Sequence, residues 1–118
     1  MEIRHKITDD ETVVLAISGE IDLYSAPLLT AAVDEFKKEG HKNFLLDMRD
    51  CPGVDSMGLG ACISIMKQLG REGGQITLAY ANERIERTFQ LAKLTAVFGF
   101  HGSLQEGLAA LSTATTQA

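Results

Sequence analysis

Strand-like apolar runs alternate with amphipathic helical patterns along almost the whole chain, and this order limits the fold more than any other feature. The strand patterns cover residues 2–7, 12–18, 44–48, 75–80 and 97–100. The first two are joined by a short acidic turn, which predicts an antiparallel hairpin, whereas strands joined through a helix lie parallel. We therefore predict an α/β fold with a mixed, mostly parallel β-sheet, an N-terminal β-hairpin and packed α-helices.

Capping residues set the expected ends of the helices. Ser25 precedes a helix with Pro27 in its first turn, the second helix spans about 57–71, and Asn82 precedes the third. Ser103 and Glu106 have the spacing of a capping box at the start of the last helix. Residues 112–118 show no periodicity, so we expect one domain over 1–111 and a disordered tail.

Composition excludes several classes of function. The 118 residues suit a single domain, and the formal net charge of −5 without a basic cluster argues against a nucleic-acid partner. No apolar run approaches the roughly 20 residues that span a bilayer, and the N-terminus lacks the apolar core of a secretory signal. We expect a cytoplasmic protein. Cys51 and Cys62 suit a reducing compartment and form no CxxC pair, so neither a metal nor another cofactor is expected.

The segment Asp55-Ser56 stands where a strand and loop give way to the second helix. Another acidic loop, ending at Asp22, follows the second strand. In an open α/β sheet, ligands and partners meet the loops beyond the carboxyl ends of the strands. If the second and third strands are neighbours, Asp22, Asp55 and Ser56 converge at one edge of the sheet.

Two readings of Ser56 follow from the pattern, and the pattern leaves both open. Ser56 can simply cap the second helix, with Asp55 a solvated loop residue. Alternatively, Ser56 is a modification site, because the free amides and partial positive charge of a helix N-terminus tolerate a phosphate. A phosphoserine carries roughly −1.5 to −2 charge at pH 7, which would change the surface sharply.

The second helix offers a candidate docking surface. Its apolar stripe, expected to face the sheet, consists of Leu59, Cys62, Ile63, Met66 and Leu69. Met57, Ala61 and Ile65 fall on the other flank and either bind a partner or pack under a neighbouring loop. Gly58 and Gly60 in the first turn suggest that another backbone or a partner approaches closely, because glycine in a helix costs about 1 kcal/mol relative to alanine.

Two motifs resemble the STAS domain family, and within it the anti-sigma factor antagonists. The first is Gly19-Glu20-Ile21-Asp22-Leu23 with Ala26-Pro27, and the second is Asp55-Ser56-Met57-Gly58-Leu59-Gly60. The resemblance covers residues 3–111. It implies a protein that is not an enzyme and that switches between partners to regulate transcription.

The resemblance also implies the partners and the site. In the family, the unphosphorylated antagonist binds an anti-sigma factor that is also a serine kinase of the histidine-kinase-like ATPase fold, which frees the sigma factor. The kinase phosphorylates the serine that corresponds to Ser56, the complex separates, and a metal-dependent serine phosphatase restores the binding form. The resemblance also implies that Asp22 and Asp55 line the docking surface around Ser56. Together with the residues that the pattern of the second helix suggests, the expected partner-binding residues are Asp22, Asp55, Ser56, Met57, Gly58, Ala61 and Ile65. Met57 stands where the family motif often carries a second serine.

Other functions remain alternatives. The partner switch can have a non-sigma output, in secretion, biofilm formation or a stress-signalling assembly, or the chain can be a STAS subunit of a lipid-transport ATPase complex. A serine hydrolase is disfavoured because the segment around Ser56 lacks the first glycine of Gly-x-Ser-x-Gly. A nucleotide-binding loop is disfavoured because no lysine follows the glycines at 58 and 60.

Overall fold

The computed structural model describes residues 1–95 and 98–117 and confirms the alternating order of strands and helices. The elements are β1 (Glu2–Ile7), β2 (Val13–Ser18), α1 (Ala26–Lys38), β3 (Asn43–Asp50), α2 (Ser56–Arg71), β4 (Gln75–Ala79), α3 (Glu83–Leu91), β5 (Phe100–His101) and α4 (Leu104–Gln117).

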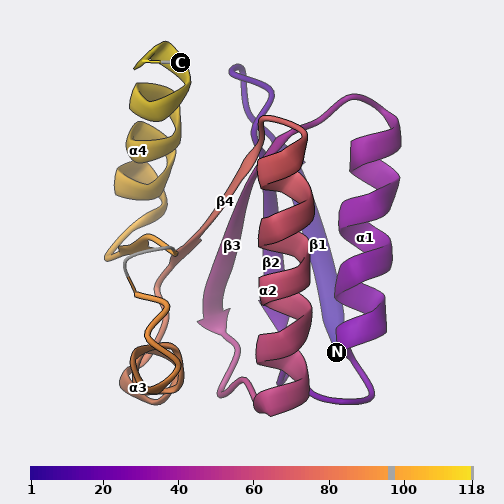
Figure 1. Ribbon diagram of the computed structural model, residues 1–118, viewed down its shortest axis with the longest axis vertical. Helices are drawn as coiled ribbons and strands as arrows, with labels where there is room; N and C mark the ends of the chain where they lie inside the picture. The colour runs from indigo at the N-terminus through magenta and orange to yellow at the C-terminus, as the bar shows by residue number, and fades with distance from the viewer. Residues whose placement is uncertain (96–97, 118) are drawn as a thin grey trace.

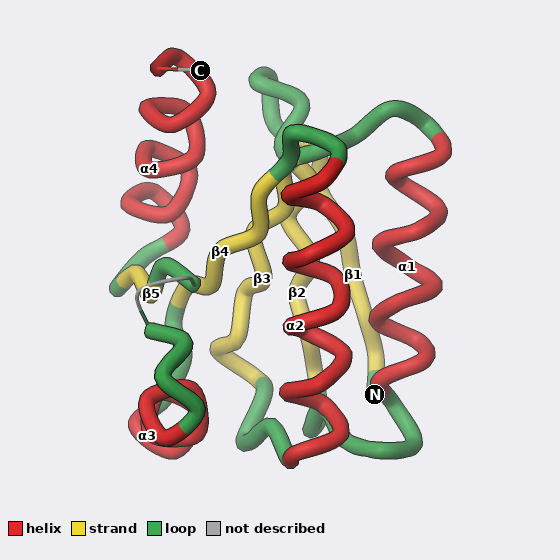
Figure 2. Tube along the Cα trace, in the orientation of Figure 1, coloured by secondary structure: helices red, strands yellow, loops and turns green. Residues whose placement is uncertain are grey.

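In the described residues these strands form one five-stranded sheet in the order β1-β2-β3-β4-β5 (Figures 1 and 2). β1 pairs antiparallel with β2, and each later pair of neighbours is parallel. The predicted mixed sheet with an N-terminal hairpin is therefore confirmed. Because β2 and β3 are parallel neighbours, their carboxyl ends lie at the same edge of the sheet.

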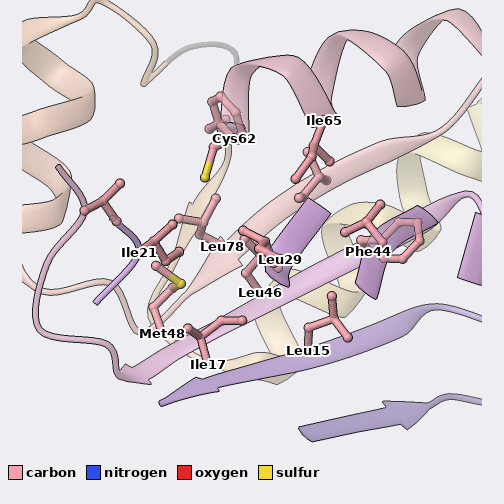
Figure 3. Close-up of a cluster of buried hydrophobic side chains, with 14 of the residues drawn as sticks. Leu15, Ile17, Ile21, Leu29, Phe44, Leu46, Met48, Cys62, Ile65 and Leu78 are labelled. Atoms are coloured by element: carbon pink, nitrogen blue, oxygen red, sulfur yellow. The ribbon is translucent and has the colours of Figure 1, made fainter. Parts of the chain in front are cut away.

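Side chains of β3 alternate between two apolar layers. Phe44, Leu46 and Met48 join the larger core, to which α1 contributes Leu29 and α2 contributes Cys62 and Ile65 (Figure 3). Ile85 and Phe89 of α3 belong to the same core. On the opposite face, Leu45 packs in a smaller cluster with three other buried residues, Val14, Ala79 and Leu111. The larger core thus lies beneath α1 and α2, and α2 begins at the Asp55-Ser56 segment.

The C-terminal part differs from the sequence prediction. β5 begins at Phe100 rather than at 97, and Val97 lies outside the described residues. α4 extends to Gln117, beyond the domain boundary predicted at 111, and residue 118 lies outside the described residues. The boundary and the tail stay predictions. Once a first turn is fixed, each further residue adds a hydrogen bond at little cost, so a helix can continue without an apolar stripe.

The predicted capping box of α4 is half formed. Ser103 Oγ accepts the amide of Glu106 at 3.1 Å, as predicted. The Glu106 carboxylate, however, accepts the amide of Gly102 at 3.0 Å instead of the amide of Ser103. None of the helices within 1–95 and 98–117 is long and apolar enough to cross a membrane.

Candidate functional site

α1 and α2 both begin at the edge of the sheet where β2 and β3 end (Figure 1). The two loops that lead into these helices are bound to each other through an isolated parallel bridge between Ile21 and Val54. The amide of Ile21 donates to the Gly53 carbonyl, and the amide of Asp55 donates to the Ile21 carbonyl, each at 3.1 Å. The loops carrying Asp22 and Asp55-Ser56 therefore lie side by side, as neighbouring parallel strands require.

A third loop braces the same edge. The Asn82 side chain caps α3 by accepting the amide of Ile85, and its Nδ2 donates to the Pro52 carbonyl at 3.0 Å. The loop before Ser56 is thus held on one side by backbone hydrogen bonds to Ile21 and on the other by the Asn82 side chain, which fixes the start of α2 relative to the sheet.

Asp55, rather than Ser56, caps α2. Asp55 has an extended backbone (φ −86°, ψ −177°), and its Oδ1 accepts the amide of Gly58 at 2.8 Å. Ser56 is the first helical residue, and its exposed side chain makes no hydrogen bond within the described part of the chain. The reading of Ser56 as the cap and of Asp55 as a solvated loop residue is therefore wrong. Aspartate and serine cap equally well, so sequence alone did not distinguish them.

Asp22 shapes its own loop. Its Oδ1 accepts the amides of Tyr24 at 3.0 Å and Ser25 at 2.9 Å. The bond from the Ser25 amide is the main cause of the lowered pKa of Asp22. Ser25 occupies the N-cap position of α1 but makes no side-chain capping bond to the helix; its Oγ accepts the Asp22 amide and lies 2.7 Å from the Glu20 carbonyl oxygen. This turn leaves Leu23 and Tyr24 exposed at 52% and 85%.

Gly58 and Ile65 do not belong to an exposed docking surface, contrary to the sequence prediction. Gly58 is buried, and a β-carbon there would overlap the Ile21 carbonyl oxygen. Ile65 is only 3% exposed and faces the sheet together with Cys62 and Leu69 (Figure 3 shows Cys62 and Ile65). The helix packs along positions 58, 62, 65 and 69, so the close approach at Gly58 is intramolecular.

Met57 and Ala61 do reach the surface. Met57 is 54% exposed, and both residues line a groove of about 470 Å³ between α2 and α1, which we call the α1–α2 groove. Its other lining residues are Leu23, Ala26, Pro27, Thr30, Ala31 and Asp34. Sequence reasoning missed the α1 side of this groove. The available signal was the pair of large apolar residues at 23 and 24, in a loop where apolar periodicity does not apply.

The cysteines are enclosed. Cys51 and Cys62 are both buried, and burial raises the pKa of both thiols, that of Cys62 to about 12. A thiol that stays protonated at neutral pH is a poor nucleophile. No cluster of three or more His, Cys, Asp or Glu side chains placed to hold a metal occurs within the described ranges.

The chain is similar in sequence and in fold to known proteins. A candidate anti-sigma factor antagonist of Thermotoga neapolitana is 31% identical over 105 residues, which are 88% of this chain and 92% of the relative. An anti-sigma-B factor antagonist of Bacillus subtilis is 27% identical over 100 residues, which are 85% and 91% of the two chains. The crystal structure of a candidate anti-sigma factor antagonist of Thermotoga maritima superposes with a TM-score of 0.86 at 29% identity, covering 93% of this chain and 94% of that one.

The family model described as the STAS domain matches residues 3–107. That match includes the sheet, the first three helices, both loops at the candidate site and the start of α4. The chain therefore belongs to the STAS domain family.

Proposed function

We propose that this protein is an anti-sigma factor antagonist controlled by phosphorylation of Ser56. STAS anti-sigma factor antagonists are regulatory binding proteins and not enzymes. In the proposed cycle, the unphosphorylated chain binds an anti-sigma factor that is also a serine kinase of the histidine-kinase-like ATPase fold. Binding releases the sigma factor, phosphorylation ends the complex, and a metal-dependent serine phosphatase restores the binding form.

The observation that carries this proposal is the position of the Ser56 hydroxyl. It is exposed at the first residue of α2, makes no hydrogen bond to the described residues, and is next in sequence to Met57 on the α1–α2 groove. A kinase can reach such a hydroxyl without unfolding the loop. A bare hydroxyl can also be covered by a partner at modest cost, because it is neutral and small.

A phosphate on Ser56 would act on binding far more than on folding. Asp55 already occupies the Gly58 amide, so the added group would not replace the helix cap. It would stand beside the Asp55 carboxylate, at the edge that also carries Asp22. Burying an unpaired charge against a partner costs several kcal/mol, and about 4 kcal/mol corresponds to a thousandfold loss of affinity.

Intact-mass and peptide mass spectrometry of the chain after incubation with the kinase and ATP tests the proposal. We expect one added phosphate, on Ser56, which Ser56→Ala abolishes. Ser64 is an exposed serine on the same helix, so Ser64→Ala is the matched control and should leave phosphorylation intact. Phosphate on other residues only, or none, would contradict the proposal.

Binding to the same kinase provides the second readout. Ser56→Ala should bind as tightly as the unmodified chain, and Ser56→Asp should bind at least tenfold more weakly, since a carboxylate carries about half of the charge of a phosphate. Equal affinity for the two variants and for the phosphorylated chain would rule out the switch.

A further inference from the structure

We infer that the α1–α2 groove receives a basic amphipathic helix of the partner, whose apolar side chains enter the groove and whose lysine or arginine pairs with Asp34. This inference rests on the proposed function in naming the kinase as the source of the helix. It extends the proposed function by naming a second surface that the kinase contacts, apart from Ser56, and the kind of side chains that this surface binds.

The walls of the groove suit a helix. On α1 the lining positions 26, 27, 30, 31 and 34 recur at helical spacing and form one stripe toward α2. On α2 the lining residues Met57 and Ala61 are one turn apart. Alanines at 26, 31 and 61 keep both walls low, so that large side chains of a facing helix can enter between two helices that begin at the same edge (Figure 1).

The carboxylate of Asp34 indicates that the bound helix is basic. Asp34 is the one charged side chain among the residues that line the groove. It forms no ion pair within the described residues, whereas Lys37, one turn further along α1, binds Glu72 at 3.0 Å and Gln68 at 3.4 Å. Lys37 is therefore engaged with α2 and its C-cap. Lys38, four residues after Asp34 on α1, makes no ion pair with Asp34 within the described residues either, so Asp34 can pair with a cation of the partner. Complementary charges chiefly provide specificity and faster association.

Large exposed side chains surround the opening of the groove, which we call the groove mouth. Leu23 and Met57 line the groove and are each more than half exposed, and Tyr24 beside Leu23 is 85% exposed. Clusters of exposed aromatic and large apolar residues are typical of binding sites for other proteins. Since Ser56 precedes Met57 in the sequence, a helix seated in the groove has one end near the Ser56 hydroxyl.

Two pairs of variants test the inference against the kinase. Asp34→Lys reverses the charge in the groove, and Glu39→Lys makes the same change at the exposed C-cap of α1, outside it. Ala31→Arg places a long cationic side chain on the groove, and Ala109→Arg does so on an exposed position of α4. We expect Asp34→Lys and Ala31→Arg to weaken kinase binding at least tenfold and both controls to stay within twofold, with unchanged melting temperatures as the check on folding.

A synthetic peptide tests the groove without the kinase. The probe is an 18-residue amphipathic helix of leucine and lysine, and its control has glutamate in place of lysine. NMR should show shifts of the methyl groups of Met57, Ala31 and Ala61 with the lysine peptide and not with the glutamate peptide. Asp34→Lys should weaken the lysine peptide at least fivefold, and Glu39→Lys should not.

The outcomes separate this inference from the proposed function. If the kinase modifies Ser56 but binds Asp34→Lys and Ala31→Arg as tightly as the unchanged chain, the groove inference is wrong and the switch stands. If no kinase modifies Ser56 but the lysine peptide fills the groove as described, the groove inference stands and the switch fails. If the peptide leaves the methyl groups unshifted, or if they shift only as the chain itself dimerises, the groove inference is overturned.

Discussion

The carbonyl oxygen of Ile21 lies where a β-carbon of residue 58 would be. The absence of a side chain at Gly58 therefore allows the start of α2 to pack against the loop after β2. We predict that Gly58→Ala lowers the free energy of unfolding by about 2–3 kcal/mol, because the oxygen belongs to backbone that is bonded to Asp55 and must shift. At Gly60 no described atom lies within 4 Å of an added β-carbon. Gly60→Ala should therefore stabilise the protein by about 0.5–1 kcal/mol. Urea unfolding of the two variants checks both signs, and equal effects would refute the packing argument.

The cap of α2 gives a second prediction. Asp55→Ala removes the acceptor of the Gly58 amide and should cost about 1 kcal/mol of stability, whereas Asp55→Asn should recover most of it. Ser56→Ala is the neighbouring control and should change stability by less than about 0.5 kcal/mol, because no described contact depends on that hydroxyl. A larger loss for Ser56→Ala than for Asp55→Ala would return the capping role to Ser56.

Substitutions at Ile65 and Met57 distinguish a residue that packs in the core from one that contacts the partner. Ile65→Ala should destabilise the chain by about 2–4 kcal/mol, because the side chain is buried in the main core. Met57→Ala should change stability by less than about 1 kcal/mol but weaken kinase binding by about tenfold, as the loss of an exposed apolar anchor does. Thermal melts and binding titrations on both variants make the comparison, and unaltered binding by Met57→Ala would remove this residue from the interface.

The buried carboxylate of Asp47 predicts a dependence of stability on pH. Burial by itself would raise the pKa of Asp47, but the hydrogen bonds from Arg49, at 2.7 Å for the shortest, outweigh it and hold the pKa below its ordinary value of 3.8. The Arg49 guanidinium in turn lies over the Tyr80 ring, 4.4 Å from its centre. A lowered folded pKa means that the stabilisation is complete well above pH 3.8 and is lost as the pH falls through the folded pKa.

Asp47→Asn should therefore cost about 1–2 kcal/mol at pH 7. The difference from the unchanged chain should shrink as the pH falls below about 3.8, the ordinary pKa of this carboxyl. Unfolding curves between pH 7 and pH 2.5 measure it, and Asp50→Asn, at an exposed position of the same strand, is the control. If the difference in unfolding free energy between Asp47→Asn and the unchanged chain stays constant with pH, the aspartate acts through its shape and not through its charge.

The sequence predicted the sheet because each strand and helix carries its own apolar period. It predicted the meeting of the loops at Asp22 and Asp55 because parallel neighbours end at one edge. It misplaced Ile65 because a period of 3.6 residues gives the relative orientation of side chains but not how much of the helix circumference the sheet and neighbouring helices cover. The exposed Leu23 and Tyr24 were missed because their orientation depends on the hydrogen bonds of the Asp22 turn, which involve the backbone and have no periodic signature.

Because both cysteine thiols are buried, we expect the natural chain to react very slowly with maleimide dyes. In a Tyr24→Cys variant the new sulfur would sit at an 85% exposed position while Cys51 and Cys62 remain shielded. A fluorophore could thus be attached at the groove mouth with both original sulfurs left in place, and its emission would report in real time when a partner arrives and when it leaves.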